Sequence, residues 1–427
     1  MLSFSRLQRR WYSGCPVYGF LQCRRWYSVC LVYDFGEEIF RPAKFNDYVT
    51  SSCGWNFKPT IVGYRYIKDG KLVEVKEEDI TEEDKERKEE LEKVLEQIQP
   101  DEDKRKLLLI ILASGISGRR IEKFFVFNGD GRNGKSLITE FTKFTLKDYY
   151  ENVDASVLSE SSKYKSSGSA NPEKAKIDKK RLVTFQEPPK NQPLNNSMVK
   201  KITGNPTLSA RMLHSNDTTV SLNLTAVMEC NSRPPFVEPP DQALSERIVD
   251  LEFGSFFTAD KSKHDATKYI YPLKTGLKTV EWMKNHRNAF MNLLIEHLIM
   301  LKRKDYVIDS FIPDDVKKRS KEYLQESFSV DQLFKFLFEK GREEDAAKYL
   351  NAKNVRKNED WTVTQVVKKI RASEKFKYLP RKTQYSNEMS ARAMKDFFKN
   401  NEEHYSVIED KSRKVHTLKG WRLKLDD

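Results

Sequence analysis

Residues 124–136 read Phe-Phe-Val-Phe-Asn-Gly-Asp-Gly-Arg-Asn-Gly-Lys-Ser, and this stretch decides the fold of the chain. Phe124 to Phe127 is apolar throughout and predicts a short buried strand, and Leu137 to Phe144 continues with the pattern of a helix. Between them stands Gly-x-x-x-x-Gly-Lys-Ser, the spacing of a phosphate-binding loop, which is credible only between a strand and a helix. The stretch therefore predicts a nucleoside-triphosphate site in an α/β fold.

Each residue type in this loop has a chemical reason to be there. The glycines let consecutive backbone N–H groups converge on the phosphates, and the start of the helix adds partial positive charge. Lys135 is expected to reach the β- and γ-phosphates, and the Ser136 hydroxyl is expected to ligate Mg²⁺. The predicted nucleotide-binding residues are Gly129, Asp130, Gly131, Arg132, Asn133, Gly134, Lys135, Ser136 and Leu137. ATP and Mg²⁺ are the expected cofactors, and a glycine-rich turn that matches by chance is the competing interpretation.

The composition narrows the class of protein. With 427 residues the chain has room for two to four domains and a large buried core. Its net charge of +13 and pI near 9.2 favour a polyanionic partner, although ribosome-associated and membrane-surface proteins share this property. The five cysteines form no CxxC pair, which argues against a zinc site or disulfide framework and favours a reducing compartment. No apolar run approaches the roughly 18 residues of a membrane span, so we expect no membrane partner.

The first 35 residues contain a near-duplication. Arg9-Arg10-Trp11-Tyr12-Ser13 returns as Arg24-Arg25-Trp26-Tyr27-Ser28, and two copies are too few for a repeat fold. The segment has no acidic residue before Asp34, and transit peptides are likewise poor in acidic residues. Its cysteines and aromatic residues are less typical of a transit peptide. We expect a disordered or duplicated leader at residues 1–35, with import into an organelle as the alternative.

Residues 36–118 are expected to form a linker or oligomerisation region. Short aromatic strands come first, and Asp69-Gly70 is a hairpin signal. Asp79 to Ile98 predicts a charged helix with a narrow apolar stripe, which either contacts another subunit or is only a solvated face. Leu107 to Ile116 predicts an apolar helix that Gly118 ends.

Two further predicted strands end in polar residues. Leu182 to Phe185 leads to Glu187, an acid that can polarise the attacking water and hold the hydration shell of the metal, if its strand lies beside the phosphate loop. Ser136 and Glu187 are therefore the predicted metal residues. Thr225 to Cys230 ends at Asn231, whose amide can position the attacking water or contact the γ-phosphate.

The connections around these strands are also predicted. Thr145 to Leu158 is interpreted as a polar and aromatic connection, and Ser159 to Pro172 as a mobile loop. Asp241 to Arg247 predicts a helical turn, and Ile248 to Phe253 predicts another strand.

A basic hairpin is predicted between Glu187 and Asn231. Asn195 to Ile202 has the pattern of a helix, and two strand segments follow on either side of a polar turn. The basic residues on or beside this hairpin are Lys200, Lys201, Arg211 and His214. Such a hairpin can follow a sugar-phosphate backbone without reading bases, and an ordinary surface hairpin is the alternative.

Four landmarks stand in one order over about 120 residues. They are Gly-x-Gly-x-Asn-Gly-Lys-Ser at 129–136, Arg-Leu-Val-x-x-x-Glu at 181–187, Lys-x-x-x-Gly at 200–204 with Arg211, and Asn-x-x-Pro at 231–234. This pattern resembles the superfamily 3 helicases, specifically the poxvirus-type primase-helicase branch of large DNA viruses and some phages. The resemblance covers residues 32–257, and a weaker resemblance extends towards the C-terminus.

The resemblance implies an AAA+-like α/β core that assembles into a hexameric ring around single-stranded DNA and unwinds it from 3′ to 5′. Lys135 and Ser136 would be phosphate-loop ligands, Glu187 the catalytic and metal acid, and Asn231 the sensor. Arg247 would reach the γ-phosphate of the neighbouring subunit, where an arginine stabilises transition-state charge; a surface salt bridge is the alternative. The ring channel would be lined by Lys200, Lys201, Arg211 and His214.

Two departures from the family pattern are visible. Family members often carry an arginine just before the one assigned to Arg247, and here that position is Glu246. The large members also carry an N-terminal primase domain, for which we find no motif. We therefore expect either a separate primase or a truncated relative.

The predicted fold class is α/β, an AAA+-like P-loop ATPase core with a mainly helical N-terminal region and a C-terminal helical or winged-helix-like module. After residues 1–35 and 36–118, the expected domains are the ATPase core at 119–257, a helical segment at 258–329 and the C-terminal module at 330–427. Further helices are predicted at Arg287 to Leu301, Val330 to Phe338, Thr362 to Ala372 and Met389 to Lys399.

The expected function is an ATP-dependent DNA helicase of viral-type genome replication. It would act inside the host cell, in the cytoplasm or nucleus, with a separate primase and other replication proteins. The alternatives are an ATP-binding DNA-binding initiator or packaging scaffold without unwinding, and a P-loop nucleotide kinase. DNA-stimulated turnover would separate the helicase from the kinase, and hydrolysis would separate it from the scaffold.

Overall fold

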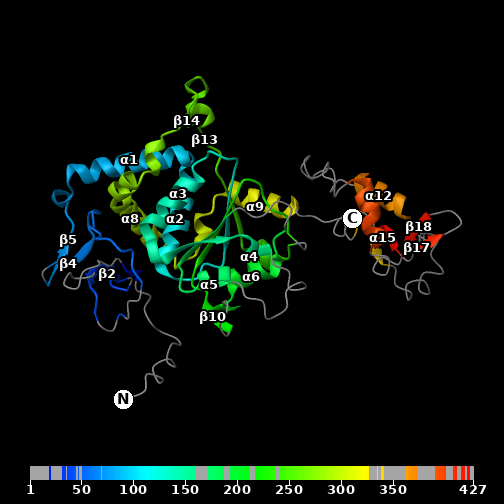
Figure 1. The fold of residues 1–427 in the computed structure, drawn as a ribbon, viewed down its shortest axis with the longest axis horizontal. Coiled ribbons are helices and arrows are strands. Elements are labelled where there is room, and N and C mark those ends of the chain that lie inside the picture. The colour runs from blue at the N-terminus through cyan, green and yellow to red at the C-terminus, as the bar shows by residue number, and fades with distance from the viewer. Residues whose placement is uncertain are drawn as a thin grey trace, which may run out of the picture. The chain divides into compact units, whose positions relative to one another are not determined.

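The computed structural model of the chain is shown in Figure 1. It describes residues 19–20, 31–34, 36–44, 47, 51–68, 70–159, 172–186, 193–211, 217–236, 240–326, 334, 338–340, 361–372, 390–400, 407–410, 415–418 and 421–423. The chain divides into two compact units, Met1–Pro234 with Gln242–Ser320 and Pro235–Asp241 with Lys321–Asp427. Most of the duplicated leader and of the predicted loop Ser159 to Pro172 lies outside the described residues. No helix among these residues is both long and apolar enough to cross a membrane.

A five-stranded, entirely parallel sheet forms the centre of the first unit. Its strands are β6 (Phe124–Asn128), β7 (Tyr150–Asp154), β8 (Leu182–Gln186), β11 (Thr225–Cys230) and β12 (Ile248–Glu252). They lie side by side in the order β12-β6-β11-β8-β7. Every residue of β6 and β11 is buried, as expected for inner strands of a parallel sheet covered on both faces. An α/β fold with a parallel sheet is thereby confirmed.

One strand of this sheet was missed from the sequence. Thr145 to Leu158 was interpreted as a connection, whereas residues 150–154 form β7 at the edge of the sheet and pair with β8. The polar residues Glu151, Asn152 and Asp154 mask the apolar signal of this strand. An edge strand tolerates them because it has only one strand neighbour and part of its surface faces solvent.

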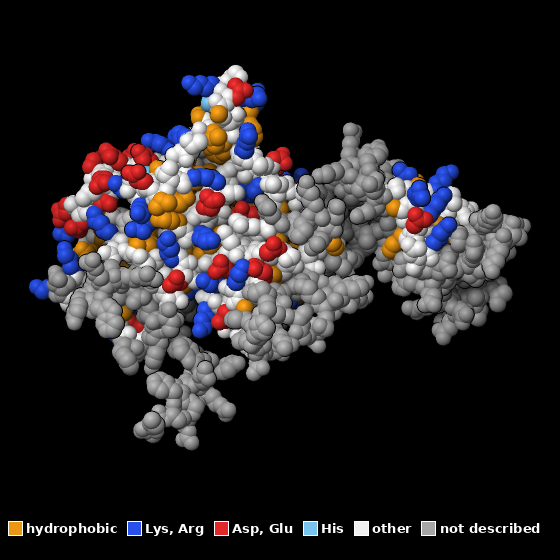
Figure 2. Space-filling model, in the orientation of Figure 1, with side chains coloured by type: hydrophobic (Ala, Val, Ile, Leu, Met, Phe, Trp, Pro, Cys, Tyr) orange, Lys and Arg blue, Asp and Glu red, His pale blue; other side chains and the backbone are white. Residues whose placement is uncertain are grey.

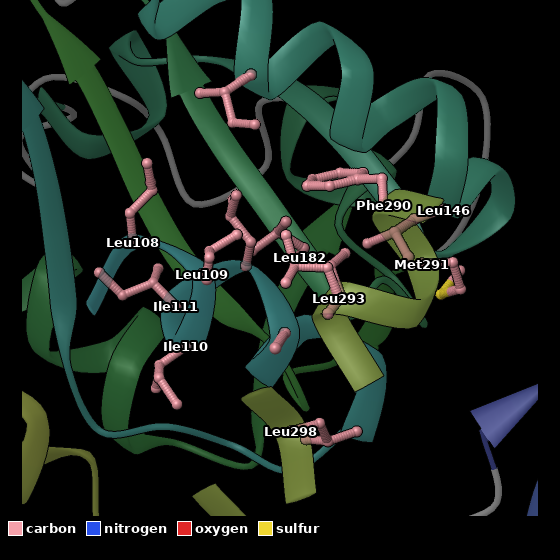
Figure 3. Close-up of a cluster of buried hydrophobic side chains, with 14 of the residues drawn as sticks. Leu108, Leu109, Ile110, Ile111, Leu146, Leu182, Phe290, Met291, Leu293 and Leu298 are labelled. Atoms are coloured by element: carbon pink, nitrogen blue, oxygen red, sulfur yellow. The ribbon is translucent and has the colours of Figure 1, made fainter. Parts of the chain in front are cut away.

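Three helices pack together on the sheet. They are α2 (Glu102–Ser117), α3 (Lys135–Leu146) and α8 (Val280–Lys302). Figure 3 shows Leu108 to Ile111 of α2, Leu182 of β8 and Phe290 of α8 as members of one buried cluster. Fully burying each such side chain contributes about 1.5–3 kcal/mol. α2 comes close to the sheet because Gly115 has no side chain: a Cβ there would lie 2.7 Å from the Leu182 Cβ.

The predicted N-terminal elements are present, but a sheet accompanies the helices. The predicted charged helix is α1 (Glu82–Ile98), and α2 ends at Gly118 in the left-handed conformation, with φ 64°. The strands are β1 (Gly19–Phe20), β2 (Leu31–Asp34), β3 (Ile39–Pro42), β4 (Arg65–Lys68) and β5 (Lys71–Glu74), with β4 and β5 forming the predicted hairpin. A mainly helical N-terminal region is therefore an incomplete description, because Tyr33 and Phe40 bury their rings on this sheet.

Shorter elements complete the first unit. They are α4 (Ser156–Ser159), α5 (Pro172–Lys176), α6 (Asn196–Gly204), β9 (Thr207–Arg211), β10 (Asp217–Ser221), α7 (Gln242–Ser245), β13 (Phe256–Thr258) and β14 (Ile270–Pro272). Helix α8 begins at Val280, earlier than the predicted Arg287, because the Thr279 side chain accepts a hydrogen bond from the Trp282 N–H and caps the helix there.

In its described residues, the second unit combines helices with short strands. Helix α9 (Asp314–Glu326) begins in the first unit and ends in the second. The remaining elements are β15 (Phe338–Lys340), β16 (Trp361–Thr362), α12 (Val363–Ala372), α15 (Ala391–Asn400), β17 (Val407–Asp410), β18 (Val415–Leu418) and β19 (Trp421–Leu423). The helices expected near 362–372 and 389–399 are confirmed. The one expected at 330–338 lies mostly outside the described residues, and its last residue begins β15. A winged-helix identity stays a prediction.

Candidate active site

The predicted phosphate-binding loop lies between β6 and α3, as expected from the sequence. Gly129 has a φ of 153° and Gly134 a φ of 88°. A Cβ on Gly129 would lie 2.4 Å from the Phe253 carbonyl oxygen, and one on Gly134 would lie 2.7 Å from Ile98 Cγ1. Only glycine fits these two positions. Helix α3 starts directly after Gly134 with no side-chain cap, so its first N–H groups point into the loop, where an anion is favoured.

The predicted phosphate-binding loop is hydrogen-bonded to the residues that follow β12. Asn133 is 3% exposed; its Nδ2 donates to the Phe253 carbonyl at 3.2 Å, and its Oδ1 accepts from the Lys135 N–H at 3.3 Å. The Phe257 N–H donates to the Arg132 carbonyl at 2.7 Å. The sequence analysis placed Asn133 and Arg132 in the loop but did not predict their hydrogen bonds to Phe253 and Phe257. These bonds join segments more than 100 residues apart.

Lys135 and Asn231 meet at the carboxyl edge of the sheet. The Lys135 side chain is 5% exposed, and its Nζ donates to the Gly129 carbonyl and lies 3.4 Å from Asn231 Oδ1. Burial lowers the pKa of Lys135, while the nearby Cys230, Glu229 and Asp130 act in the opposite direction. Ser136 is exposed at the first turn of α3. The structure thus brings together the lysine and the asparagine that the sequence analysis selected, and the selected serine follows the lysine in α3.

The acid predicted at position 187 lies outside the described residues, and the expectation about its strand is wrong. β8, which ends at Gln186, is not a neighbour of β6, because β11 lies between them. The strand order depends on which way each crossover connection turns, and the chain distance between Lys135 and Glu187 contains no information on this. Any role of Glu187 at the phosphates must therefore extend across the end of β11.

A second carboxylate lies on β11 itself and was missed. Glu229 is 7% exposed and is paired in register with Phe127 of β6 and Gln186 of β8. Burial raises the pKa of Glu229, and hydrogen bonding by Thr139 and Gln186, together with the positive charge of Lys135, opposes that rise. Among the described groups, its Oε1 has no hydrogen-bond partner. The only signal in the sequence was one acid inside an otherwise uncharged strand.

Arg247 lies at the opposite edge of the sheet from the phosphate loop. It comes immediately before β12, which runs parallel to β6, so the whole strand separates it from the loop of its own chain. Its Nη1 donates to Thr203 Oγ1 at 3.2 Å, and its Nη2 lies 3.5 Å from Glu122 Oε2. The guanidinium also packs on Gly204, where a Cβ would lie 2.7 Å from Nη1. Within one chain, Arg247 contacts the end of α6 and not the nucleotide site.

The predicted hairpin exists as β9 and β10, which pair antiparallel with Arg211 opposite Asp217. Lys201 is exposed and Lys200 half-buried on α6, the helix immediately before the hairpin. The tip with His214 and the side chain of Arg211 lie outside what the structure describes. Convergence of the four basic residues stays a prediction.

The chain is similar in sequence to two viral proteins. No family model matches the chain. It is 29% identical over 287 residues to "Putative helicase L207/L206" of Acanthamoeba polyphaga mimivirus, across 61% of this chain and 29% of that protein. It is 28% identical over 184 residues to "Putative helicase 022R" of Frog virus 3, across 42% of this chain and 19% of that protein. The chain thus spans less than a third of the length of these curated relatives.

Among solved structures, the chain is similar to an A form apo structure of the NrS-1 C-terminal region. The match has 14% identity and a TM-score of 0.39, and it covers 85% of this chain and 84% of that one. A second apo structure of the same region gives a TM-score of 0.38. Similarity this low supports no argument about fold or function. Both sequence relatives carry the words "Putative helicase" in their names.

Proposed function

We propose that this chain is the ATP-driven motor of a superfamily 3 DNA helicase used in viral-type genome replication. The observation that carries the proposal is the meeting of Lys135 and Asn231 beside a phosphate-binding loop at the carboxyl edge of a parallel sheet. Two relatives named as viral helicases add support. Because the chain spans only part of these relatives, priming and other steps are assigned to other segments or proteins.

The proposed chemistry is hydrolysis of the γ-phosphate of ATP. Lys135 moves its ammonium from the Gly129 carbonyl onto the β- and γ-phosphates, and the N–H groups that begin α3 bind the phosphate oxygens. Asn231 holds the attacking water or the γ-phosphate, and Glu187 accepts the proton of that water. Ser136 and Glu187 would hold Mg²⁺, which when bound neutralises phosphate charge. The exposed hydroxyl of Ser136 at the helix start fits this role.

Assembly completes the proposed site. Arg247 would act on the nucleotide of a neighbouring subunit in a hexameric ring, since its own phosphate loop is at the other edge of the sheet. The hairpin of β9 and β10, with Lys200 and Lys201, would contact single-stranded DNA in the channel. Because α6 carries both lysines and also contacts Arg247 through Thr203, the neighbour's nucleotide and the DNA contact would be joined by one short helix.

The experiment that tests the proposal replaces the phosphate-loop lysine. Lys135→Ala is expected to lower ATP turnover about 10²- to 10³-fold, the loss seen when one transition-state donor is removed, and to abolish strand displacement. Lys143→Ala, an exposed lysine in the same helix, is the matched control and should turn over ATP like the wild type. Retained turnover in Lys135→Ala with an unchanged melting temperature would refute the assignment.

Tailed DNA substrates separate the rival functions. Lys200→Ala with Lys201→Ala should lower DNA-stimulated turnover more than turnover without DNA, because both lysines would contact the strand. Turnover that DNA does not stimulate would select the nucleotide kinase. ATP binding and ring formation without hydrolysis would select the initiator or packaging scaffold.

A further inference from the structure

Residues 254–278, here called the arm, connect β12 to α8 and project from the rest of the first unit (Figure 1). In the arm, β13 pairs in parallel with β14. Two short 3₁₀ turns lie between these strands, and the side chains of Asp260 and Asp265 cap them by accepting from the N–H groups of Ser262 and Thr267. The arm is thus an ordered element, and neither the nucleotide site nor the basic hairpin explains it.

The arm exposes aromatic and aliphatic side chains. Phe256 is 37% exposed, and Tyr269 and Leu273 are each 48% exposed. These are three of the seven large hydrophobic residues that are exposed among the described positions, and they come from one short segment. Such a concentration indicates a binding surface, because single exposed apolar residues are otherwise scattered.

The same surface is positively charged. Residues 254–278 contain five lysines and two aspartates and therefore carry a net charge of +3 with the histidine neutral. Lys263 lies 3.3 Å from Asp260 and Lys268 lies 3.0 Å from Asp265, but both lysines are mostly exposed. Exposed ion pairs of this kind contribute at most about 1 kcal/mol, so both ammonium groups can move to a phosphate at little cost. Figure 2 shows lysine and hydrophobic side chains together on the arm.

A hollow in the arm has dimensions suited to part of a nucleotide. It is an open hollow of about 340 Å³, and its lining includes Phe256, Lys263, His264, Asp265 and Lys268. An aromatic face offers a surface on which any base can stack, and the ammonium groups of Lys263 and Lys268 can bind phosphates. Aromatic residues interleaved with lysines are the chemistry by which proteins bind single-stranded nucleic acid without sequence preference. The charge favours this polyanion over a second protein as the occupant.

The base of the arm is hydrogen-bonded to the phosphate-binding loop. The Phe257 N–H donates to the Arg132 carbonyl at 2.7 Å, and Asn133 Nδ2 donates to the Phe253 carbonyl at 3.2 Å. Movement of the loop around a triphosphate would therefore be transmitted to the arm directly through Phe257 and also through Phe253, the residue immediately before the arm.

We propose that the arm is a second contact for single-stranded nucleic acid, in addition to the hairpin, and that the phosphate loop sets its position. The inference deepens the proposed function and rests on it for the link to nucleotide. The contact itself requires only the arm, with its lysines, its aromatic surface and its hollow.

The test compares two matched double variants by fluorescence anisotropy with labelled oligothymidylate of about 16 nucleotides, over a series of salt concentrations. Lys263→Ala with Lys268→Ala removes the arm charges. Lys85→Ala with Lys93→Ala removes two lysines of α1 that also pair with acids of their own helix, at 3.7 and 3.8 Å. The arm variant should weaken binding and reduce the slope of log affinity against log salt by about 1.4, which corresponds to two lost phosphate contacts. The control should keep the wild-type slope.

A third variant tests the stacking contribution. Tyr269 has a φ of 57°, and Tyr269→Asn preserves this conformation because asparagine adopts it readily. Its affinity should fall about tenfold, within the range for one lost base stack, with the wild-type salt slope. An unchanged slope in the lysine variant overturns the proposal, and a changed sedimentation coefficient with an unchanged slope would identify the arm as a protein interface instead. If the wild type binds through the arm but hydrolyses no ATP, the motor assignment fails and the contact stands.

Discussion

Arg247 cannot reach the phosphates bound by its own chain, and this predicts a result for mixed subunits. β12 lies between Arg247 and the edge that carries the phosphate loop, and its five residues span roughly 16 Å at about 3.3 Å each. Arg247→Ala alone is expected to lower ATP turnover about 10³- to 10⁵-fold, the loss typical of an arginine that stabilises the transferring phosphoryl group. Lys135→Ala alone is expected to be nearly inactive as well.

Mixing the two inactive variants should restore turnover. When equal amounts assemble at random, about one quarter of the subunit interfaces combine an intact Lys135 with an intact Arg247 from the neighbour. Phosphate release per subunit should therefore recover to about a quarter of the wild-type rate, far above either variant alone. The assay is steady-state phosphate release at saturating ATP, with the mass of the assembly measured in parallel.

A matched control separates assembly from chemistry. Arg247→Ala mixed with the double variant Lys135→Ala, Arg247→Ala offers no intact interface and should stay inactive. If mixed oligomers form and the two single variants still show no recovery, Arg247 does not act on a neighbour's nucleotide. Its contacts with Thr203 and Glu122 would then be its whole role.

Three further predictions concern single residues. Burial raises the pKa of Glu229 above its usual 4.5, so its contribution to the free energy of unfolding is fully present below that value and is lost as pH rises through the higher folded pKa. The melting temperature of Glu229→Gln should therefore rise relative to that of the wild type between pH 4 and pH 8. A difference that stays constant over this range would refute the argument. Arg233 lies 2.5 Å from the fully buried Asp250, which Arg319 also contacts at 3.1 Å. Arg233→Met should lower the free energy of unfolding by about 3 kcal/mol in urea titrations, whereas a change below about 1 kcal/mol would show that Arg319 alone compensates the buried carboxylate. Gly129→Ala forces a Cβ to within 2.4 Å of a backbone oxygen and should weaken binding of a fluorescent ATP analogue. Gly276→Ala, which lies outside the loop and has nothing within 4 Å of the new Cβ, should bind normally; equal affinities would contradict this account of the loop.

The elements around the phosphate loop could be predicted because their signals are local. The apolar run 124–127, the glycine spacing and the helix that follows are all written within about 20 residues, and the structure confirms β6 and α3 there. The β9–β10 hairpin was found for the same reason. β7 was missed because an edge strand can be polar, so Glu151 and Asn152 resemble residues of a loop.

Lys135 and Asn231 were each assigned to the phosphates from the sequence, and the structure brings them together because the strands that precede them are parallel and share one carboxyl edge. The position of β11 between β6 and β8 could not be predicted from the sequence. Parallel strands are joined by long crossover connections, and no local sequence pattern indicates beside which strand such a connection ends. The same applies to Glu229, whose burial and nearness to Lys135 arise from that strand order.

The sequence by itself therefore predicted a triphosphate-binding loop, the strand and helix on either side of it, and a positive charge that favours a polyanionic partner. Tertiary structure alone decided which carboxylate is buried beside the lysine, that Arg247 faces away from its own nucleotide site, and that the arm is hydrogen-bonded to the phosphate loop. The physical reason is the range of the interactions. Backbone geometry and periodicity act over a few residues, whereas strand order and the contacts of Arg132 and Asn133 join residues more than 100 positions apart.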